Sequence, residues 1–148
     1  MNLEYNQILK ISGLDSLQNL SILNLEGNRI KKIEGLESLS NLQDLNLSNN
    51  QIEILYQLTS LKNLRFLRLK QNRIRKIENL RSLENLEYLQ LDNNQITEID
   101  GSEFPLCLHL VLLAEFAAVK GIEEHIRKVK IYLFENPIMK GVLSKYPQ

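Results

Sequence analysis

Leucines recur along this chain with a fixed period of 22 residues. Three leucine columns follow this period, and the first contains Leu20, Leu42, Leu64 and Leu86. The repeating unit reads LxxLxLxxNxIxxIxxLxxLxN, and four consecutive copies match it. A period of this length indicates a solenoid, because one such unit cannot bury its apolar side chains without stacking against its neighbours.

The LxL segment of each unit predicts a short β-strand. Alternate side chains of a strand point to opposite faces, so we expect Leu23 and Leu25 in the core and Asn24 outside it. The spacings of three in IxxIxxLxxL predict short 3₁₀ or helical segments on the convex side. The predicted fold is therefore an α/β solenoid, with a curved parallel sheet on its concave face and a Leu/Ile core behind it.

An asparagine follows each predicted strand, where the chain turns away from the sheet. Its amide both donates and accepts, so it can bond backbone groups of neighbouring turns. Phe116 takes this position in the unit after Asn94, so we expect one interruption of the ladder there. The predicted ladder residues are Asn28, Asn50, Asn72, Asn94 and, beyond the interruption, Asn136.

The composition narrows the kinds of partner. The chain has 148 residues with 18 basic and 18 acidic side chains, and this balance argues against nucleic acid. One cysteine excludes an internal disulfide framework and favours a reducing compartment, cytoplasmic or nuclear. No secretory signal is visible, and the longest apolar run is too short to span a bilayer. We therefore expect a protein partner, and neither nucleic acid nor a membrane.

The repeat pattern predicts a single domain over residues 1–148. Its expected parts are a partial first repeat at 1–19, regular repeats at 20–101, a degenerate repeat at 102–128, and a terminal repeat with an incomplete cap at 129–148. The first unit shows no N-terminal cap. We therefore expect apolar surface at that end and self-association through uncapped ends.

The unit resembles the 22-residue class of leucine-rich repeat, and most of all the leucine-rich-repeat regulatory subunit of protein phosphatase 1. The segments NRIKKIEGL at residues 28–36 and NRIRKIENL at 72–80 read almost like that family's consensus. The resemblance implies a non-catalytic scaffold that binds the phosphatase catalytic subunit on its concave face. Acidic and aromatic concave residues make that contact in the family, and Asp44, Phe66 and Tyr88 fit this type.

The outward positions of the predicted strands change from polar in the early units to apolar in the later ones. Contiguous exposed apolar surface marks an interaction site, and aromatic side chains are preferred anchors. In the expected order of strands, Leu110 and Leu112 lie between Tyr88 and Tyr132. The predicted partner-binding residues are Asp44, Phe66, Arg68, Tyr88, Leu110, Leu112, Tyr132 and Phe134.

Other interpretations of the repeats remain open. A cytoskeletal or splicing adapter carries similar repeats, and so does an internalin-type bacterial adhesin or effector. Two interpretations of one group of basic residues also remain open. The group can contact phosphate or an acidic peptide, or it can be charged surface that neighbouring carboxylates balance. Its members are Arg65, Arg68, Lys70, Arg73, Arg75 and Lys76.

The sequence predicts no enzyme, metal site or cofactor. Cys107 and His109 flank Leu108, which is a core position of a predicted strand, and no third ligand or orienting acid is spaced with them. His125 stands beside two glutamates, as expected of a solvated turn. The chain contains no glycine-rich phosphate loop.

Overall fold

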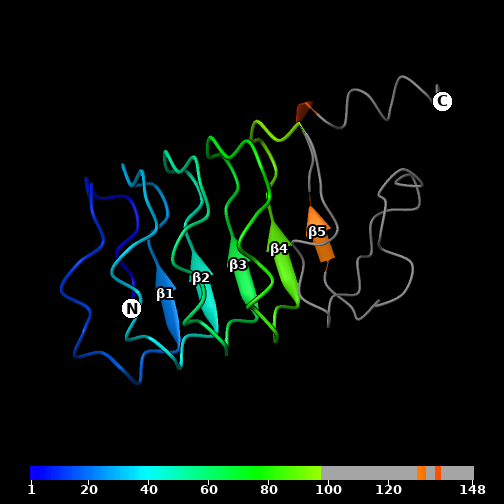
Figure 1. Ribbon diagram of the computed structural model, residues 1–148. Coiled ribbons are helices and arrows are strands. Elements are labelled where there is room, and N and C mark those ends of the chain that lie inside the picture. The colour runs from blue at the N-terminus through cyan, green and yellow to red at the C-terminus, as the bar shows by residue number, and fades with distance from the viewer. Residues whose placement is uncertain (98–129, 133–135, 138–148) are drawn as a thin grey trace.

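The computed structural model describes residues 1–97, 130–132 and 136–137. Within them, three-residue strands form one parallel sheet whose order follows the chain (Figure 1). The strands are β1 (Ile22–Asn24), β2 (Asp44–Asn46), β3 (Phe66–Arg68), β4 (Tyr88–Gln90) and β5 (Lys130–Tyr132). This arrangement confirms the predicted leucine-rich-repeat solenoid.

The 22-residue period sets the register of the sheet. Ile22 pairs with Asp44, Asp44 with Phe66, and Phe66 with Tyr88, so equivalent positions form straight rows across the strands. The central leucine of each strand from β1 to β4 is fully buried, whereas its two neighbours are partly or fully exposed. The predicted alternation between core and concave face is therefore confirmed for these strands.

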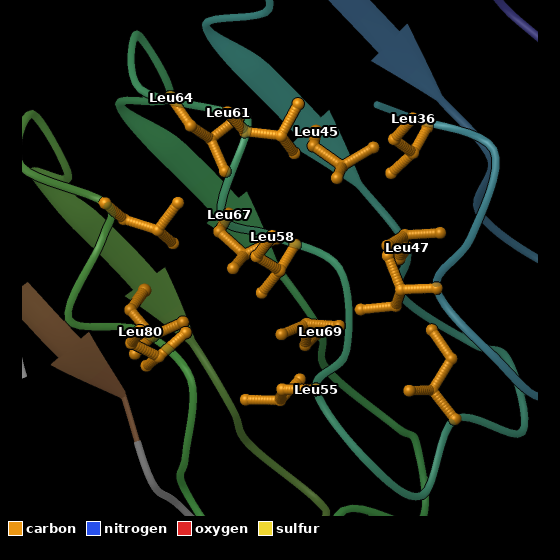
Figure 2. Packing of buried hydrophobic residues seen from close by; sticks show 14 of the residues in the cluster. Leu36, Leu45, Leu47, Leu55, Leu58, Leu61, Leu64, Leu67, Leu69 and Leu80 are labelled. Carbon is orange, nitrogen blue, oxygen red and sulfur yellow. The ribbon is translucent and has the colours of Figure 1, made fainter. Parts of the chain in front are cut away.

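The core lies between the sheet and the returning segments of the coils. Strand leucines such as Leu45 and Leu67 form one cluster with Leu58 and Leu61 of the returning segments (Figure 2). All four have 0% exposure. Burying a leucine stabilises the fold by roughly 1.5–3 kcal/mol, so the stacked leucines provide the main driving force for folding.

The convex side of the described coils is built from single turns. The N–H of Leu39 donates to the carbonyl of Leu36 at 3.0 Å, and Leu42 repeats this bond to Leu39 at 3.0 Å. Bonds between residues three apart are the 3₁₀ pattern, and a spacing of three keeps these leucines on one side. The expected 3₁₀ geometry is thus present as successive turns rather than as longer helical segments.

Each coil also contains positions in the left-handed region of backbone space. One column of them contains Gly13, Gly35, Gln57 and Asn79, with φ between 53° and 74°. Glycine adopts this conformation without the penalty that a Cβ brings. At Gly35 an added Cβ would also collide with the backbone carbonyl of Ile11. The chain nevertheless uses larger residues at this turn in two later coils.

The asparagine ladder links each coil to the one before it. The Oδ1 of Asn50 accepts from the N–H of Ile30 at 3.0 Å, and its Nδ2 donates to the carbonyls of Leu25 at 3.0 Å and Leu47 at 3.1 Å. Asn28, Asn72 and Asn94 repeat this pattern. Buried backbone groups that the turn would leave unpaired are satisfied in this way.

Asn136 continues the ladder directly after Asn94. Its Oδ1 accepts from the N–H of Ile96 at 3.1 Å, and its Nδ2 donates to the carbonyl of Leu91 at 2.8 Å. The prediction that Phe116 interrupts the ladder between them is therefore wrong. An amide can accept the N–H of Ile96, which a phenylalanine ring cannot, and the coil that carries the amide occupies the next place in the stack.

The strand order requires a second correction. Leu89 of β4 pairs directly with Ile131 of β5, and Tyr88 pairs with Lys130. The expected position of Leu110 and Leu112 between these strands is therefore wrong, because β5 already fills the edge of β4. Leu110, Leu112, Phe116 and Phe134 themselves lie outside the described residues, as do Cys107, His109 and His125, so the boundaries expected beyond residue 101 stay predictions.

Candidate partner-binding surface

Four of the predicted binding residues meet on the concave face of β2, β3 and β4. Asp44, Phe66 and Tyr88 occupy one row of the sheet, and Arg68 stands two residues after Phe66 on the same strand. All four side chains are half-buried. Neighbouring strands lie about 4.8 Å apart, so the row brings these side chains into contact range. We call these four residues the concave cluster.

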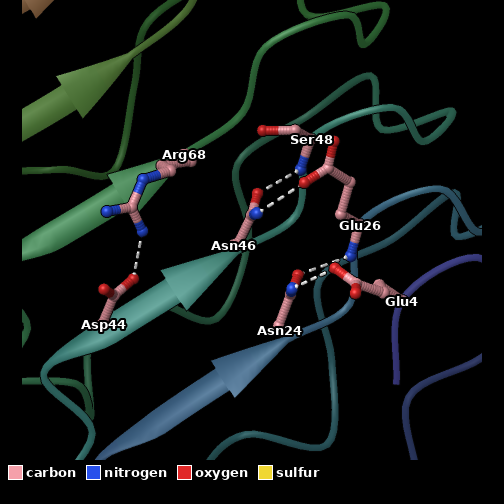
Figure 3. A network of polar contacts seen from close by, with 7 residues as sticks. All are labelled: Glu4, Asn24, Glu26, Asp44, Asn46, Ser48 and Arg68. Carbon is pink, nitrogen blue, oxygen red and sulfur yellow. Dashed lines mark hydrogen bonds and ion pairs between the residues drawn. The ribbon is translucent and has the colours of Figure 1, made fainter. Parts of the chain in front are cut away.

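Arg68 is the centre of the concave cluster. Its guanidinium donates to the carboxylate of Asp44 on the preceding strand (Figure 3). Its Cζ lies 6.0 Å from the ring centroid of Phe66 and 5.7 Å from that of Tyr88. Attraction between a cation and an aromatic face acts at such distances. The side chain is therefore held in place from two neighbouring strands.

The two aromatic rings of the cluster lie close to each other. Their centroids are 6.3 Å apart and their planes are inclined by 43°. Arg65 adds a second cation, with its Cζ 5.5 Å from the Phe66 centroid. Arg65 also donates to both carboxylate oxygens of Glu87 at 2.8 and 2.9 Å, and this bidentate bond raises the pKa of Arg65 above its ordinary value. The rings thus stand among fixed positive charges.

The N-terminal part of the concave face is polar and pairs within itself. The Nδ2 of Asn46 donates to Glu26 at 2.9 Å, and the Nδ2 of Asn24 donates to Glu4 at 2.6 Å (Figure 3). Asn49 adds a third amide at 2.8 Å from Glu26. The carboxylates of this region are therefore already hydrogen-bonded to side-chain amides of the same chain.

Tyr5 borders this network at the N-terminal end. Its hydroxyl donates to Glu26 at 3.4 Å. The negative charge of Glu26 raises the pKa of Tyr5, and desolvation, the hydrogen bond and the charge of Glu4 act in the same direction. A proton on Tyr5 is thus favoured by the folded chain.

The sequence interpretation left open that neighbouring carboxylates balance the basic group, as Glu87 does for Arg65, but it missed the amide contacts of Glu4 and Glu26. The period itself carried the signal for Arg65, because Arg65 and Glu87 are oppositely charged and one period apart. It also related Glu4 to Glu26 and Asn24 to Asn46, so a polar network could be inferred from rows of equivalent positions. Of the remaining predicted residues, Tyr132 lies on β5 with its backbone paired to Gln90, and its side chain is outside the described part.

Neither a metal site nor a membrane span is found in the described part of the chain. No three His, Cys, Asp or Glu residues among those described lie close enough together to hold a metal ion. None of the described helical segments is both long and apolar enough to cross a bilayer.

Comparison with known proteins identifies the repeats. The family described as "Leucine Rich repeats (2 copies)" matches residues 18–61, 40–82 and 62–105, which together cover more than half of the chain. The chain belongs to the leucine-rich-repeat family. Leucine-rich-repeat proteins are in general interaction scaffolds that bind other proteins. A search of curated proteins finds no match to the sequence.

Three solved structures show the leucine-rich-repeat likeness. An internalin, inlF, from Listeria monocytogenes has a TM-score of 0.65 and 25% identity, over 90% of this chain and 34% of the internalin. A leucine-rich-repeat protein from Leptospira interrogans has a TM-score of 0.58 and 31% identity, over 70% of this chain and 26% of that one. Internalin C2 from Listeria monocytogenes has a TM-score of 0.52 and 30% identity, over 65% of this chain and 52% of internalin C2.

The leucine-rich-repeat chain thus spans about a quarter to a half of the length of these three proteins. The similarity supports the fold and the class of interaction scaffold. It does not support the finer resemblance to the phosphatase regulatory subunit, which none of the three is.

Proposed function

We propose that this chain is a non-catalytic scaffold that binds a globular protein partner on its concave face. The observation that carries the proposal is the pair of half-exposed aromatic residues Phe66 and Tyr88 on the outer side of the sheet. Leu67 and Leu89 behind them are fully buried, and neither ring belongs to the hydrophobic core cluster. The fold therefore has no need of aromatic side chains there, whereas a binding surface does.

The fixed geometry of the concave cluster supports the same proposal. Arg68 is held by Asp44 and by both rings before any partner arrives. Binding is less costly when the contributing side chains are already ordered, since less conformational entropy is lost. Arginine and tyrosine are also among the residues that most often dominate the energetics of an interface.

Two partner classes follow from different observations. Asp44, Phe66 and Tyr88 share one row of the sheet and fit the acidic and aromatic contacts of the phosphatase regulatory subunit. This match favours the phosphatase 1 catalytic subunit as the partner and a cytoplasmic or nuclear site of action. The similarity to two internalins favours an adhesin or effector of that type. A cytoskeletal or splicing adapter remains a further protein-binding alternative.

A photo-crosslinking experiment tests the proposal. A photoreactive phenylalanine analogue replaces Phe66 in one variant and Tyr56 in the other, where Tyr56 is 47% exposed but belongs to none of the strands. We expect purified phosphatase 1 catalytic subunit, or an extracellular receptor domain in the internalin case, to be crosslinked from position 66 only. Equal yields from both positions with every bound partner would contradict the concave-face proposal.

A further inference from the structure

We infer that the concave cluster recognises an acidic, extended segment of the partner, with an apolar side chain placed beside its carboxylates. This inference rests on the proposed function and specifies the chemistry of its partner. The positive groups that carry it are Arg68 on β3 and Lys70, the next outward residue after that strand. The apolar part is received by Phe66 and Tyr88.

Arg68 has donors that the chain does not use. A guanidinium carries five N–H groups, and the side chain of Arg68 forms a hydrogen bond only to Asp44 within the described residues. The side chain is 34% exposed, and none of its nitrogens is both buried and without a partner, so the unused donors remain accessible from outside. An oxygen of the partner can take the place of water at these donors.

Lys70 extends the set of unused donors. Its backbone carbonyl accepts from the N–H of Asn49 and the Nδ2 of Asn72, but its ammonium has no ion pair or hydrogen bond among the residues described. The side chain is half-buried. In extended backbone, residues two positions apart lie about 6.6 Å from each other on the same face, and alternate side chains of an extended partner segment have the same spacing.

The nearby carboxylates are committed to other groups. Glu26 accepts from Asn46 and Asn49, and the buried Asp92 accepts from Gln90 at 3.0 Å. Asp44 and Glu87 form ion pairs with Arg68 and Arg65, whereas no carboxylate of the described residues forms an ion pair with the ammonium of Lys70. A carboxylate of the partner can therefore pair with Lys70 without displacing a contact within the chain, which a basic side chain cannot do.

The aromatic rings specify what stands beside the carboxylates. Phe66 and Tyr88 are half-exposed and 6.3 Å apart, so each ring still presents apolar surface next to the positive groups. An apolar side chain loses contact with water when it packs on such rings. An extended segment that combines acidic residues with one aromatic residue satisfies both parts of the surface.

Peptide titrations of the ¹⁵N-labelled full chain test this inference. The probes are blocked pentapeptides of sequence Glu-Glu-Phe-Glu-Glu, Gln-Gln-Phe-Gln-Gln and Lys-Lys-Phe-Lys-Lys. We expect the acidic peptide alone to shift amide resonances of β3 and β4, and its Kd to rise several-fold when NaCl is raised from about 50 mM to about 300 mM. The double variant R68Q/K70Q should weaken this binding about tenfold or more, which corresponds to about 1.4 kcal/mol.

The double variant R73Q/R75Q is the matched control, because it removes the same charge from exposed residues that lie outside the strands. An unchanged amide spectrum shows that each variant is folded. The inference is overturned if the neutral or basic peptide binds as tightly, if the control loses as much affinity, or if millimolar acidic peptide shifts no resonance. A partner that depends on Phe66 and Tyr88 but not on Arg68 and Lys70 would overturn the acidic chemistry and leave the proposed scaffold function in place.

Discussion

The backbone N–H of Ile96 donates to Oδ1 of Asn136 at 3.1 Å, although 40 residues separate them along the chain. In the earlier coils the same bond joins residues 20 apart, as between Ile74 and Asn94 at 3.0 Å. The pairing of β4 with β5 shows the same displacement. The stack therefore passes from the coil of Asn94 to the coil of Asn136 with no strand between them.

This relationship predicts the effect of removing the amide. In an Asn136→Ala variant, the N–H of Ile96 loses its acceptor, so we expect its hydrogen exchange to accelerate by at least about tenfold. Native-state exchange measured by NMR checks this, with the amide of Ile74, which is bonded to Asn94, as the internal control. An Ile96 amide that already exchanges freely in the unchanged protein would contradict the direct stacking of these coils.

The regular ladder predicts a large loss of stability at Asn50. Its side chain bonds to Ile30, Leu25, Leu47 and Ser48, and all of these bonds are lost in an Asn50→Ala variant. Each buried backbone group left unpaired costs about 1–3 kcal/mol, so we expect the free energy of unfolding in urea to fall by at least about 2 kcal/mol.

Asn41 provides the matched control for that substitution. It belongs to a second, exposed column of asparagines, and the one side-chain hydrogen bond that it donates within the described residues goes to the carbonyl of Gln18 at 3.0 Å. An Asn41→Ala variant should lose less than about 1 kcal/mol, since water replaces an exposed bond. Similar losses for the two variants would show that burial does not set the strength of the ladder.

The left-handed column predicts a stabilising substitution. Gln57 has φ of 53°, a region that costs most residues about 1–2 kcal/mol and glycine almost nothing. A Gln57→Gly variant should therefore gain up to about 1 kcal/mol of stability in urea unfolding, even though glycine also loosens the unfolded chain. Gly35→Ala should be destabilising because its Cβ meets Ile11. A loss of stability in the Gln57→Gly variant would refute the strain at this position.

The network around Glu26 predicts a dependence on alkaline pH. The pKa of Tyr5 is raised in the folded chain, chiefly by the charge of Glu26. The interaction of protonated Tyr5 with Glu26 therefore stabilises the fold fully below the pKa that Tyr5 has in the unfolded chain, about 10. This stabilisation is lost as the pH rises through the higher pKa of Tyr5 in the folded chain. Unfolding free energies measured across this range should fall more steeply for the unchanged protein than for Tyr5→Phe. Parallel pH profiles would show that Glu26 does not act on Tyr5.

The sequence was sufficient to predict the rows of the concave face but not the side-chain contacts within them. The period placed Asp44, Phe66 and Tyr88 in one row, because identical spacing produces identical register. It could not show that Arg68 reaches back to Asp44, since that choice of rotamer depends on both neighbouring strands. Nor could it show that Asn136 follows Asn94 in the ladder, because the 22-residue period alone places the next unit directly after Asn94 and not 42 residues later.

The affinity of a purified partner for Phe66→Ala and Tyr88→Ala tests the central claim most directly. Each substitution should weaken binding by about 2 kcal/mol or more, because aromatic anchors dominate interfaces. Stability should change little, since both rings lie outside the leucine core. Tyr56→Ala, which removes an exposed ring away from the strands, should leave the affinity unchanged. Unchanged affinity in the two concave variants, or an equal loss in Tyr56→Ala, would contradict a binding surface at Phe66 and Tyr88.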